Sequence, residues 1–251
     1  TGQSGRDLQA GRANRESQMP SREELLEAFD SLRVADVCDA MDMCGLMGRG
    51  LLSREIRPLF RDVDGFAHCF RGLAKTVRYM PTNRPVPTVS PREWPDYIED
   101  WRKNISPGFG GIQPGDAIVM DAADQDVGFI GSGNSLGWRI AGAVGAVTNG
   151  GARDTDELIR QKWPVYSRFI SRTFKPARLE LDAKDVPVNV GGVLIRPGDV
   201  IVADGDGVIC VPREAAREVA RLARIEREKD MVGRRKAFEK LGLPMDRTVG
   251  G

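Results

Sequence analysis

The sequence predicts an α/β domain with a mixed β-sheet and flanking helices, on two observations. Between residues 114 and 169, apolar strand-like runs alternate with helical segments, a pattern typical of βαβ units. Residues 187–212 instead hold short apolar runs separated by Gly-Gly, Pro-Gly and Asp-Gly turns, which indicates antiparallel strands. The sheet is therefore expected to combine parallel and antiparallel strands.

Helices are predicted near both ends of the chain. Ser21 can cap a helix over residues 21–32, and Glu24, three positions later, completes a capping box. Residues 34–45 predict a second short helix, which ends at a glycine. Residues 213–242 predict a long charged amphipathic helix, or two of them.

A long segment rich in Pro, Gly and Trp follows the first predicted strand. Residues 72–80 alternate between apolar and polar side chains as a strand does. Residues 81–112 are too many for a simple loop, and we expect a short helix inside them that carries Trp94, Tyr97 and Trp101. Insertions of this kind often shape binding sites.

The alternating region contains three predicted strands and two predicted helices. Its strands are buried apolar runs, and its helices follow glycine-rich or acidic turns. In chain order we expect a strand over 114–122, a helix that opens at Asn134, a strand over 145–151, a helix over 154–161 and a strand over 164–169.

The predicted organisation is one main domain with two tails. We expect a flexible arm over residues 1–20, a main domain over 21–232 and a C-terminal extension over 233–251. The polar start lacks a hydrophobic signal core, no apolar run reaches the roughly 18 residues of a membrane helix, and the net charge is +1. These features predict a cytoplasmic protein with neither nucleic acid nor membrane as partner.

The cysteine and histidine content narrows the chemistry. No CxxC pair is present, so we expect reduced, buried thiols. The single histidine, His68, almost excludes Ser-His-Asp and Cys-His catalysis and any metal site with two His ligands. A bound metal would have carboxylate, carbonyl and water ligands, which favours magnesium, manganese or calcium. The cysteines are Cys38, Cys44, Cys69 and Cys210.

The stretch GSGNSLG, residues 131–137, leads into a predicted helix. Glycines at a helix start leave backbone N–H groups free, and the helix dipole favours an anion there, such as a phosphate or a carboxylate. The glycine spacing is not the dinucleotide fingerprint, and no P-loop lysine follows. A tight strand–helix turn without a ligand is the alternative.

The stretch RDTDE carries three chemically distinct side chains directly after a glycine-ended strand. Arg153 offers a planar fork for a carboxylate, and Asp154 could bind a hard cation. Glu157 lies one helical turn further on, on the same side. Since ligands of open α/β sheets bind outside the carboxyl ends of strands, a ligand site is expected here. The alternative is a plain helix that Asp154 caps and Glu157 completes.

A third motif, IVADGDGVICVP over residues 201–212, has the DxDG pattern of some phosphatases. That chemistry requires a complete doubly wound domain downstream, and too few residues follow. A β-hairpin with an Asp-Gly turn is therefore the favoured interpretation.

Several stretches in a fixed order resemble one family. Residues 149–169 contain Gly, Arg-Asp-x-x-Glu-Leu and Pro-Val-aromatic, residues 187–212 resemble the family's C-terminal signature, and residues 114–122 with the glycine turn after them also fit. Over roughly residues 22–232 the chain resembles the RraA-like superfamily, which includes class II 4-hydroxy-4-methyl-2-oxoglutarate / 4-carboxy-4-hydroxy-2-oxoadipate aldolases and a regulator of ribonuclease E activity. The resemblance implies a three-layer β/β/α swivelling fold, homotrimers or homohexamers, and sites between subunits.

The resemblance also implies roles for particular residues. Arg153 would bind the carboxylate and the enolate of a 2-oxo acid, and Asp154, with Glu157, would bind Mg²⁺ or Mn²⁺. A glutamate of a neighbouring subunit's C-terminal helix, Glu226 or Glu228, would reach the metal site. The substrate carboxylate would also contact Gly133 and the backbone N–H groups near Asn134, Ser135 and Leu136.

The sequence leaves three functions open. The main hypothesis is a metal-dependent lyase, an aldolase or oxaloacetate decarboxylase, that forms a pyruvate enolate; a Schiff-base route through Lys75 or Lys162 is disfavoured. The second is a hydratase, dehydratase or hydrolase of a sugar acid or aromatic breakdown product, which the aromatic insertion would bind. The third is a non-catalytic protein that regulates a ribonuclease.

Overall fold

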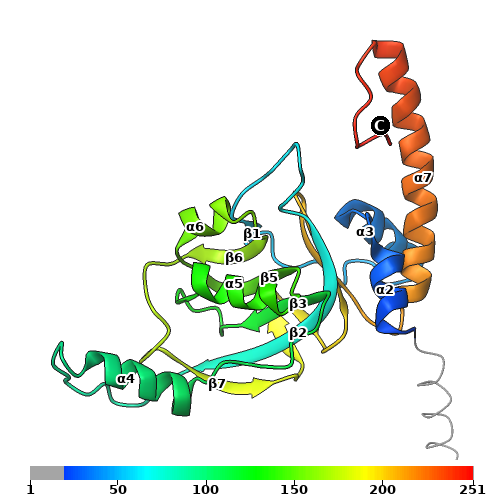
Figure 1. Cartoon of the computed structure of the whole chain (residues 1–251). Coiled ribbons are helices and arrows are strands. Elements are labelled where there is room, and N and C mark those ends of the chain that lie inside the picture. Colours follow the sequence, from blue (N-terminus) through cyan, green and yellow to red (C-terminus); the bar gives the residue numbers. More distant parts are fainter. Residues whose placement is uncertain (1–19, 251) are drawn as a thin grey trace, which may run out of the picture.

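In the computed structural model, which describes residues 20–250, nine strands form one mixed sheet (Figure 1). The strand order is β1-β6-β5-β3-β2-β10-β11, with β4 beside β5 and β7 beside β2. A separate hairpin, β8 (Val188–Val190) and β9 (Val193–Ile195), completes the described strands. The strands of the sheet are β1 (Arg57–Pro58), β2 (Phe70–Pro81), β3 (Asp116–Asp121), β4 (Gly128–Ile130), β5 (Gly145–Ala152), β6 (Val165–Ile170), β7 (Leu179–Lys184), β10 (Val200–Asp204) and β11 (Gly207–Val211).

The sheet is parallel in the middle and antiparallel at its margins. Strands β2, β3, β5 and β6 run parallel, whereas β10 and β11 form an antiparallel hairpin beside β2. Leu51 pairs with Ile209 of β11, and the chain then continues to β1 beside β6, so the sheet is nearly closed. The predicted α/β class with a mixed sheet is confirmed.

Alternate residues of the central strands face two different cores. Val119 of β3 and Val147 of β5 point into the barrel interior, whereas their neighbours Ile118 and Ala146 pack beneath α5 and α6. Both neighbours are fully buried, which explains why these strands read as continuous apolar runs. Helix α5 spans Ser132–Ile140 and helix α6 spans Thr155–Arg160.

A second group of helices covers β10 and β11 on the other side of the molecule (Figure 1). Helix α2 (Arg22–Phe29) begins with the predicted capping box, in which the Glu24 N–H donates to Ser21 Oγ at 3.1 Å. Helix α3 (Val34–Met43) and helix α7 (Ala216–Leu241) share one apolar core with α2 and with strands β10 and β11. The charged C-terminal segment is thus one helix, and the proposed boundary at residue 232 lies inside it.

The predicted insertion is a small helical unit that reaches beyond the sheet (Figure 1). Helix α4 (Trp94–Asp100) continues into a π-helical turn, η1 (Trp101–Ile105). Trp101 is buried, which anchors the unit, whereas Trp94 is exposed. The short helix predicted in this segment is confirmed.

Three differences from the predicted elements matter below. Helix α5 begins at Ser132, two residues before the predicted start. Strands β4 and β7 were not predicted. Strand β4, which precedes α5, is short, and β7 alternates charged with apolar residues. The predicted arm lies outside the described residues apart from Pro20, and no helix of residues 20–250 is long and apolar enough to cross a membrane.

Candidate functional site

The sheet topology brings the two glycine-rich motifs together. Strand β4 pairs in parallel with β5, so both strands end at the same edge of the sheet. Helix α5 follows β4, and helix α6 follows β5. The start of α5 and the Arg153–Asp154 turn therefore lie side by side.

Asp154 directs its side chain away from its own helix. It occupies the N-cap position of α6 with φ 54° and ψ 44°, a left-handed conformation that Asp tolerates better than most residues, and it makes no capping hydrogen bond. Its Oδ2 instead accepts from the Ser132 N–H at 3.2 Å and the Ser132 Oγ at 3.3 Å, at the start of α5. The alternative of a plain capped helix, with Glu157 completing the box, is wrong.

Two glycines make room for the Arg153–Asp154 turn. A Cβ on Gly131 would lie 2.8 Å from Asp154 Oδ2, and one on Gly128 would lie 3.2 Å from the Cβ and Cδ atoms of Arg153. Both distances are shorter than ordinary van der Waals contacts. The bare backbone near this turn therefore lets two charged side chains approach the start of a helix.

Arg153 keeps most of its guanidinium available. Its Nε donates to Asp154 Oδ1 at 3.2 Å, and its Cζ lies 5.4 Å from the centroid of the Phe174 ring. The side chains of Arg153 and Asp154 are 37% and 35% exposed, so solvent and ligands reach both. Within residues 20–250, the terminal nitrogens of Arg153 have no hydrogen-bond acceptor. They form a free fork for an anion.

The Asp154 carboxylate is ionised at neutral pH. Partial burial raises its pKa, but hydrogen bonds from Arg153 and Ser132 oppose that effect and leave the pKa below its ordinary value. Oδ1 accepts only the bond from Arg153 and so keeps a lone pair for a further ligand. An ionised and half-exposed carboxylate suits a hard cation.

The earlier start of α5 changes which backbone groups are free. The first helical bond runs from the Ser135 N–H to the Gly131 carbonyl, so the N–H groups of Gly133 and Asn134 have no helical partner. Ser135 is fully buried, and its Oγ bonds to the Ser132 carbonyl and to Gln161. The predicted backbone contact at Ser135 is therefore corrected to Gly133 and Asn134.

The other predicted binding residues of α5 differ in their exposure and contacts. The Asn134 side chain donates to the Phe129 carbonyl at 3.1 Å, which fixes the first turn of the helix against β4. The Leu136 side chain is 45% exposed, and Gly133 has open space around its Cα. Gly133 and Asn134 therefore present the exposed end of the helix.

The residues fit a divalent cation with few protein ligands. Among residues 20–250 no three His, Cys, Asp or Glu side chains gather closely enough to hold a metal ion. Asp154 is thus the candidate ligand, with the exposed Glu157 on the first turn of α6 as the second. Magnesium is commonly bound by one or two carboxylates and retains several waters, so Asp154 and Glu157 have the chemistry of magnesium ligands.

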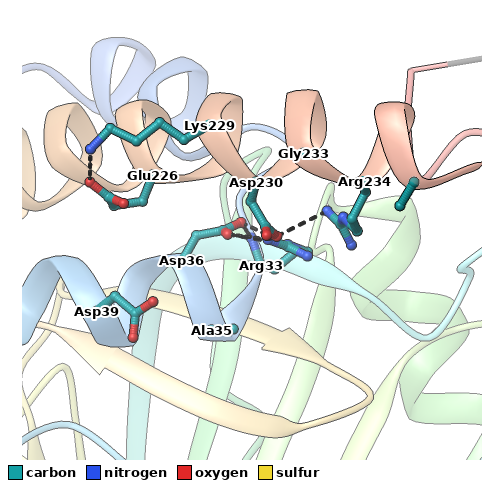
Figure 2. Close-up of a pocket in the computed structure, with 10 residues that line it drawn as sticks. Arg33, Ala35, Asp36, Asp39, Glu226, Lys229, Asp230, Gly233 and Arg234 are labelled. Atoms are coloured by element: carbon teal, nitrogen blue, oxygen red, sulfur yellow. Dashed lines mark hydrogen bonds and ion pairs between the residues drawn. The ribbon is translucent and has the colours of Figure 1, made fainter.

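The two predicted glutamates of α7 lie in a different region of the same chain. Glu226 pairs with Lys229 at 2.6 Å and lines a groove of about 570 Å³ between α3 and α7 (Figure 2). In this groove Asp230 lies between Arg33 and Arg234 (Figure 2). Helix α7 and the site helices α5 and α6 pack into separate cores, so a role for Glu226 or Glu228 at Arg153 requires a neighbouring subunit.

The remaining residues that the sequence singled out have other contacts in the structure. Asp204 lies in the β10–β11 hairpin and caps α3 through the Val34 N–H, so the favoured hairpin interpretation is confirmed. His68 is buried, and its Nδ1 accepts from the Asp62 backbone N–H. All four cysteines are free thiols, although only Cys210 is fully buried. None of these residues contacts Arg153.

Each lysine considered for a Schiff base has an acidic side chain beside it. Lys75 pairs with Asp185 at 2.9 Å, and the exposed Lys162 lies 3.6 Å from Asp62. The structure instead places Lys175, which the sequence did not single out, beside Phe174 and Arg102. No local pattern marks these residues, because separate segments of the chain bring them together.

Comparison with known proteins identifies the family. The model of the RraA-like family, described as Aldolase/RraA, matches residues 34–210. The chain therefore belongs to the RraA-like family, and its fold agrees with that assignment. Streptomyces coelicolor RraAS2, described as an unusual member of the RNase ES inhibitor RraA protein family, has a similar crystal structure with 26% identity and a TM-score of 0.68. The similarity covers 86% of this chain and 99% of that one.

Curated relatives include proteins with aldolase names. A Burkholderia mallei protein named "Putative 4-hydroxy-4-methyl-2-oxoglutarate aldolase" is 30% identical over 174 residues, which cover 69% of this chain and 92% of that protein. Protein DlpA of Legionella pneumophila is 28% identical over 201 residues, 78% of this chain. The matches span only 28%, 46% and 56% of the lengths of three curated relatives, DlpA among them.

Proposed function

We propose that this protein is a divalent-metal-dependent lyase that cleaves a C–C bond of a 2-oxo acid through a pyruvate enolate. The observation that supports this most is the free Arg153 guanidinium beside the ionised Asp154, both at the exposed start of α5. A divalent cation, free backbone N–H groups and an arginine at one place would together stabilise the negative charge of an enolate. The aldolase names of several relatives point to the same reaction class.

The proposed binding mode follows from the site geometry. The substrate carboxylate binds to the Arg153 fork and to the N–H groups of Gly133 and Asn134, where the helix dipole favours negative charge. Asp154, with Glu157 as the second candidate, holds Mg²⁺ or Mn²⁺. When bound, such an ion supplies Lewis acidity toward the substrate oxygens.

Arg153 stabilises the charge that develops during cleavage. With 4-hydroxy-4-methyl-2-oxoglutarate, a base removes the proton of the 4-hydroxyl, the C3–C4 bond breaks, and one pyruvate and one pyruvate enolate form. The enolate then takes up a proton at C3 and becomes a second pyruvate. Loss of CO₂ from oxaloacetate gives the same enolate, so one site can serve both reactions. The fixed positive charge of Arg153 faces the enolate oxygen in each case.

The base that removes the hydroxyl proton is expected to come from outside the Arg153–Asp154 turn and the start of α5. His68 is buried elsewhere, and the chain's own Glu226 and Glu228 are carried by α7, which packs into the other core. We propose that Glu226 or Glu228 of a neighbouring subunit completes the site in a trimer or hexamer. On α7 Glu228 is exposed, whereas Glu226 is half-buried and pairs with Lys229.

Pyruvate release tests the proposed function. The purified protein is incubated with 4-hydroxy-4-methyl-2-oxoglutarate or oxaloacetate, with Mg²⁺ or with EDTA, and pyruvate is measured with coupled lactate dehydrogenase. Release with Mg²⁺ that EDTA abolishes is expected. No release from either substrate would contradict the lyase and favour the hydratase or hydrolase alternative, whose reactions yield no pyruvate.

A further inference from the structure

The helical insertion carries a second arginine to the Phe174 ring. Arg102 lies in η1, and its Cζ is 5.6 Å from the centroid of the ring that Arg153 also approaches. Trp101, the preceding residue, is 2% exposed and fixes the turn, whereas Arg102 itself is exposed. Within residues 20–250 no carboxylate pairs with Arg102. Two guanidiniums from distant segments therefore share one aromatic ring.

Lys175 adds a third positive charge to this cluster. It follows Phe174 directly, and its Nζ lies 4.9 Å from the centroid of the buried Tyr79 ring. Burial and the nearby charge of Arg102 lower the pKa of Lys175 to about 8. Its ammonium has no acidic partner in the described part of the chain. A partly desolvated cation without a counter-ion is unfavourable, so an external anion would stabilise it.

Three aromatic residues pack on one another in the insertion that carries Arg102. Trp94 and Tyr97 have ring centroids 5.6 Å apart, and Tyr97 and Trp101 have centroids 6.2 Å apart. They therefore pack mainly on one another and do not form an open wall for a ring-shaped substrate. The buried Tyr97 Oη and Trp101 Nε1 have no hydrogen-bond partner in residues 20–250.

We propose that Arg102, at the Phe174 ring, and Lys175, the residue after Phe174, form an anion subsite for the distal carboxylate of the substrate. This proposal rests on the proposed lyase site, since Arg153 contacts the same ring and would hold the other end of the molecule. Arg102 and Lys175 would make the proposed lyase prefer 2-oxo diacids to monoacids, because a monoacid would leave the two cations unpaired. Charge-assisted hydrogen bonds to both ends would fix the position of the scissile bond.

Binding of a matched pair of acids tests this subsite without any turnover. With Mg²⁺ present, calorimetry measures the dissociation constants of 2-oxoglutarate and of 2-oxopentanoate, which has a methyl group in place of the distal carboxylate. Arg102→Ala and Lys175→Met are expected to weaken 2-oxoglutarate binding by about tenfold or more and to change 2-oxopentanoate binding less than about twofold. Lys103→Ala, which removes the neighbouring exposed charge of the same turn, is the control and should behave as wild type.

The outcomes separate this proposal from the lyase proposal. Equal losses for both acids, unchanged binding in both variants, or no binding of either acid to the wild type would overturn the subsite. Trapping of Lys175 by borohydride with a 2-oxo acid would also overturn it, because the lysine would then be a nucleophile. Selective loss in a protein that releases no pyruvate would keep the subsite and refute the lyase.

Discussion

Two aspartates at strand ends show how similar local chemistry serves different purposes. Asp154 follows β5 and Asp204 ends β10, and each accepts a hydrogen bond from the first residue of a helix elsewhere in the chain: Ser132 at 3.2 Å and Val34 at 2.8 Å. Asp204 is buried, and its other oxygen accepts from the Asp206 N–H. Asp154 is exposed, and its other oxygen meets an arginine. Burial makes one turn a closed cap, and exposure leaves the other open to a ligand.

The largest expected effect on activity comes from Asp154→Asn, which is compared with a separate change of Asp204. Asp154→Asn keeps a residue that tolerates the left-handed backbone, so the fold should persist. Loss of the metal ligand should lower kcat/KM by on the order of 10²–10³, because the cation supplies several kcal/mol of stabilisation. Enzyme kinetics and thermal unfolding measure the two effects separately.

Asp204→Ala is expected to act in the opposite way. Loss of a helix cap should reduce the free energy of unfolding by about 1–2 kcal/mol, and kcat per folded molecule should stay close to wild type. If Asp204→Ala lost activity without losing stability, the distinction between the closed and the open turn would fail.

An effect of intermediate size is expected from Gly131, whose backbone lies against the Asp154 side chain. Gly131 has an ordinary extended backbone, so Gly131→Ala adds no backbone strain, but its Cβ would displace Asp154 Oδ2 from 2.8 Å. The activating concentration of Mg²⁺ should rise by about tenfold, as for other residues that orient a metal ligand. Gly137→Ala, in the same helix with open space at its Cβ, should change it less than about twofold. Equal effects would show that helix propensity, and not the contact, is responsible.

A smaller effect is expected from the pH dependence of Lys175. Its folded-state pKa of about 8 lies below the ordinary 10.5, so between these values the unfolded chain binds more protons. Wild-type stability relative to Lys175→Met should therefore rise by on the order of 1 kcal/mol from pH 8 to pH 10. Urea unfolding at the two pH values measures this change, and a flat difference would contradict the buried charge.

The main constellation of the site could be predicted from the sequence because it is local. Strand β5 is buried along its whole length and ends in Gly150-Gly151-Ala152, and Arg153 and Asp154 follow directly. Sheet topology then places them at a strand end, where ligands bind. The fold class followed equally from local patterns, since strand and helix periodicities differ.

The rest depended on contacts between distant segments. The start of α5 is set by Asp154, which lies 22 residues beyond Ser132 in the chain, so local spacing placed that start two residues too late. Strand β7 was missed because its alternating charged and apolar residues form a strand only by pairing with the C-terminal half of β2. Arg102 reaches the Phe174 ring, one residue before Lys175 in the chain, only through the packing of the insertion, which no local pattern encodes.

The measurement that tests the central claim most directly is pyruvate release by Arg153→Ala. Its guanidinium is half-exposed and makes one protein hydrogen bond, so the variant should fold as wild type does. With Mg²⁺ and 4-hydroxy-4-methyl-2-oxoglutarate, kcat/KM should fall at least about 100-fold, the loss expected when a donor to a developing oxyanion is removed. Wild-type rates of release in a folded Arg153→Ala variant would contradict an enolate site at this turn.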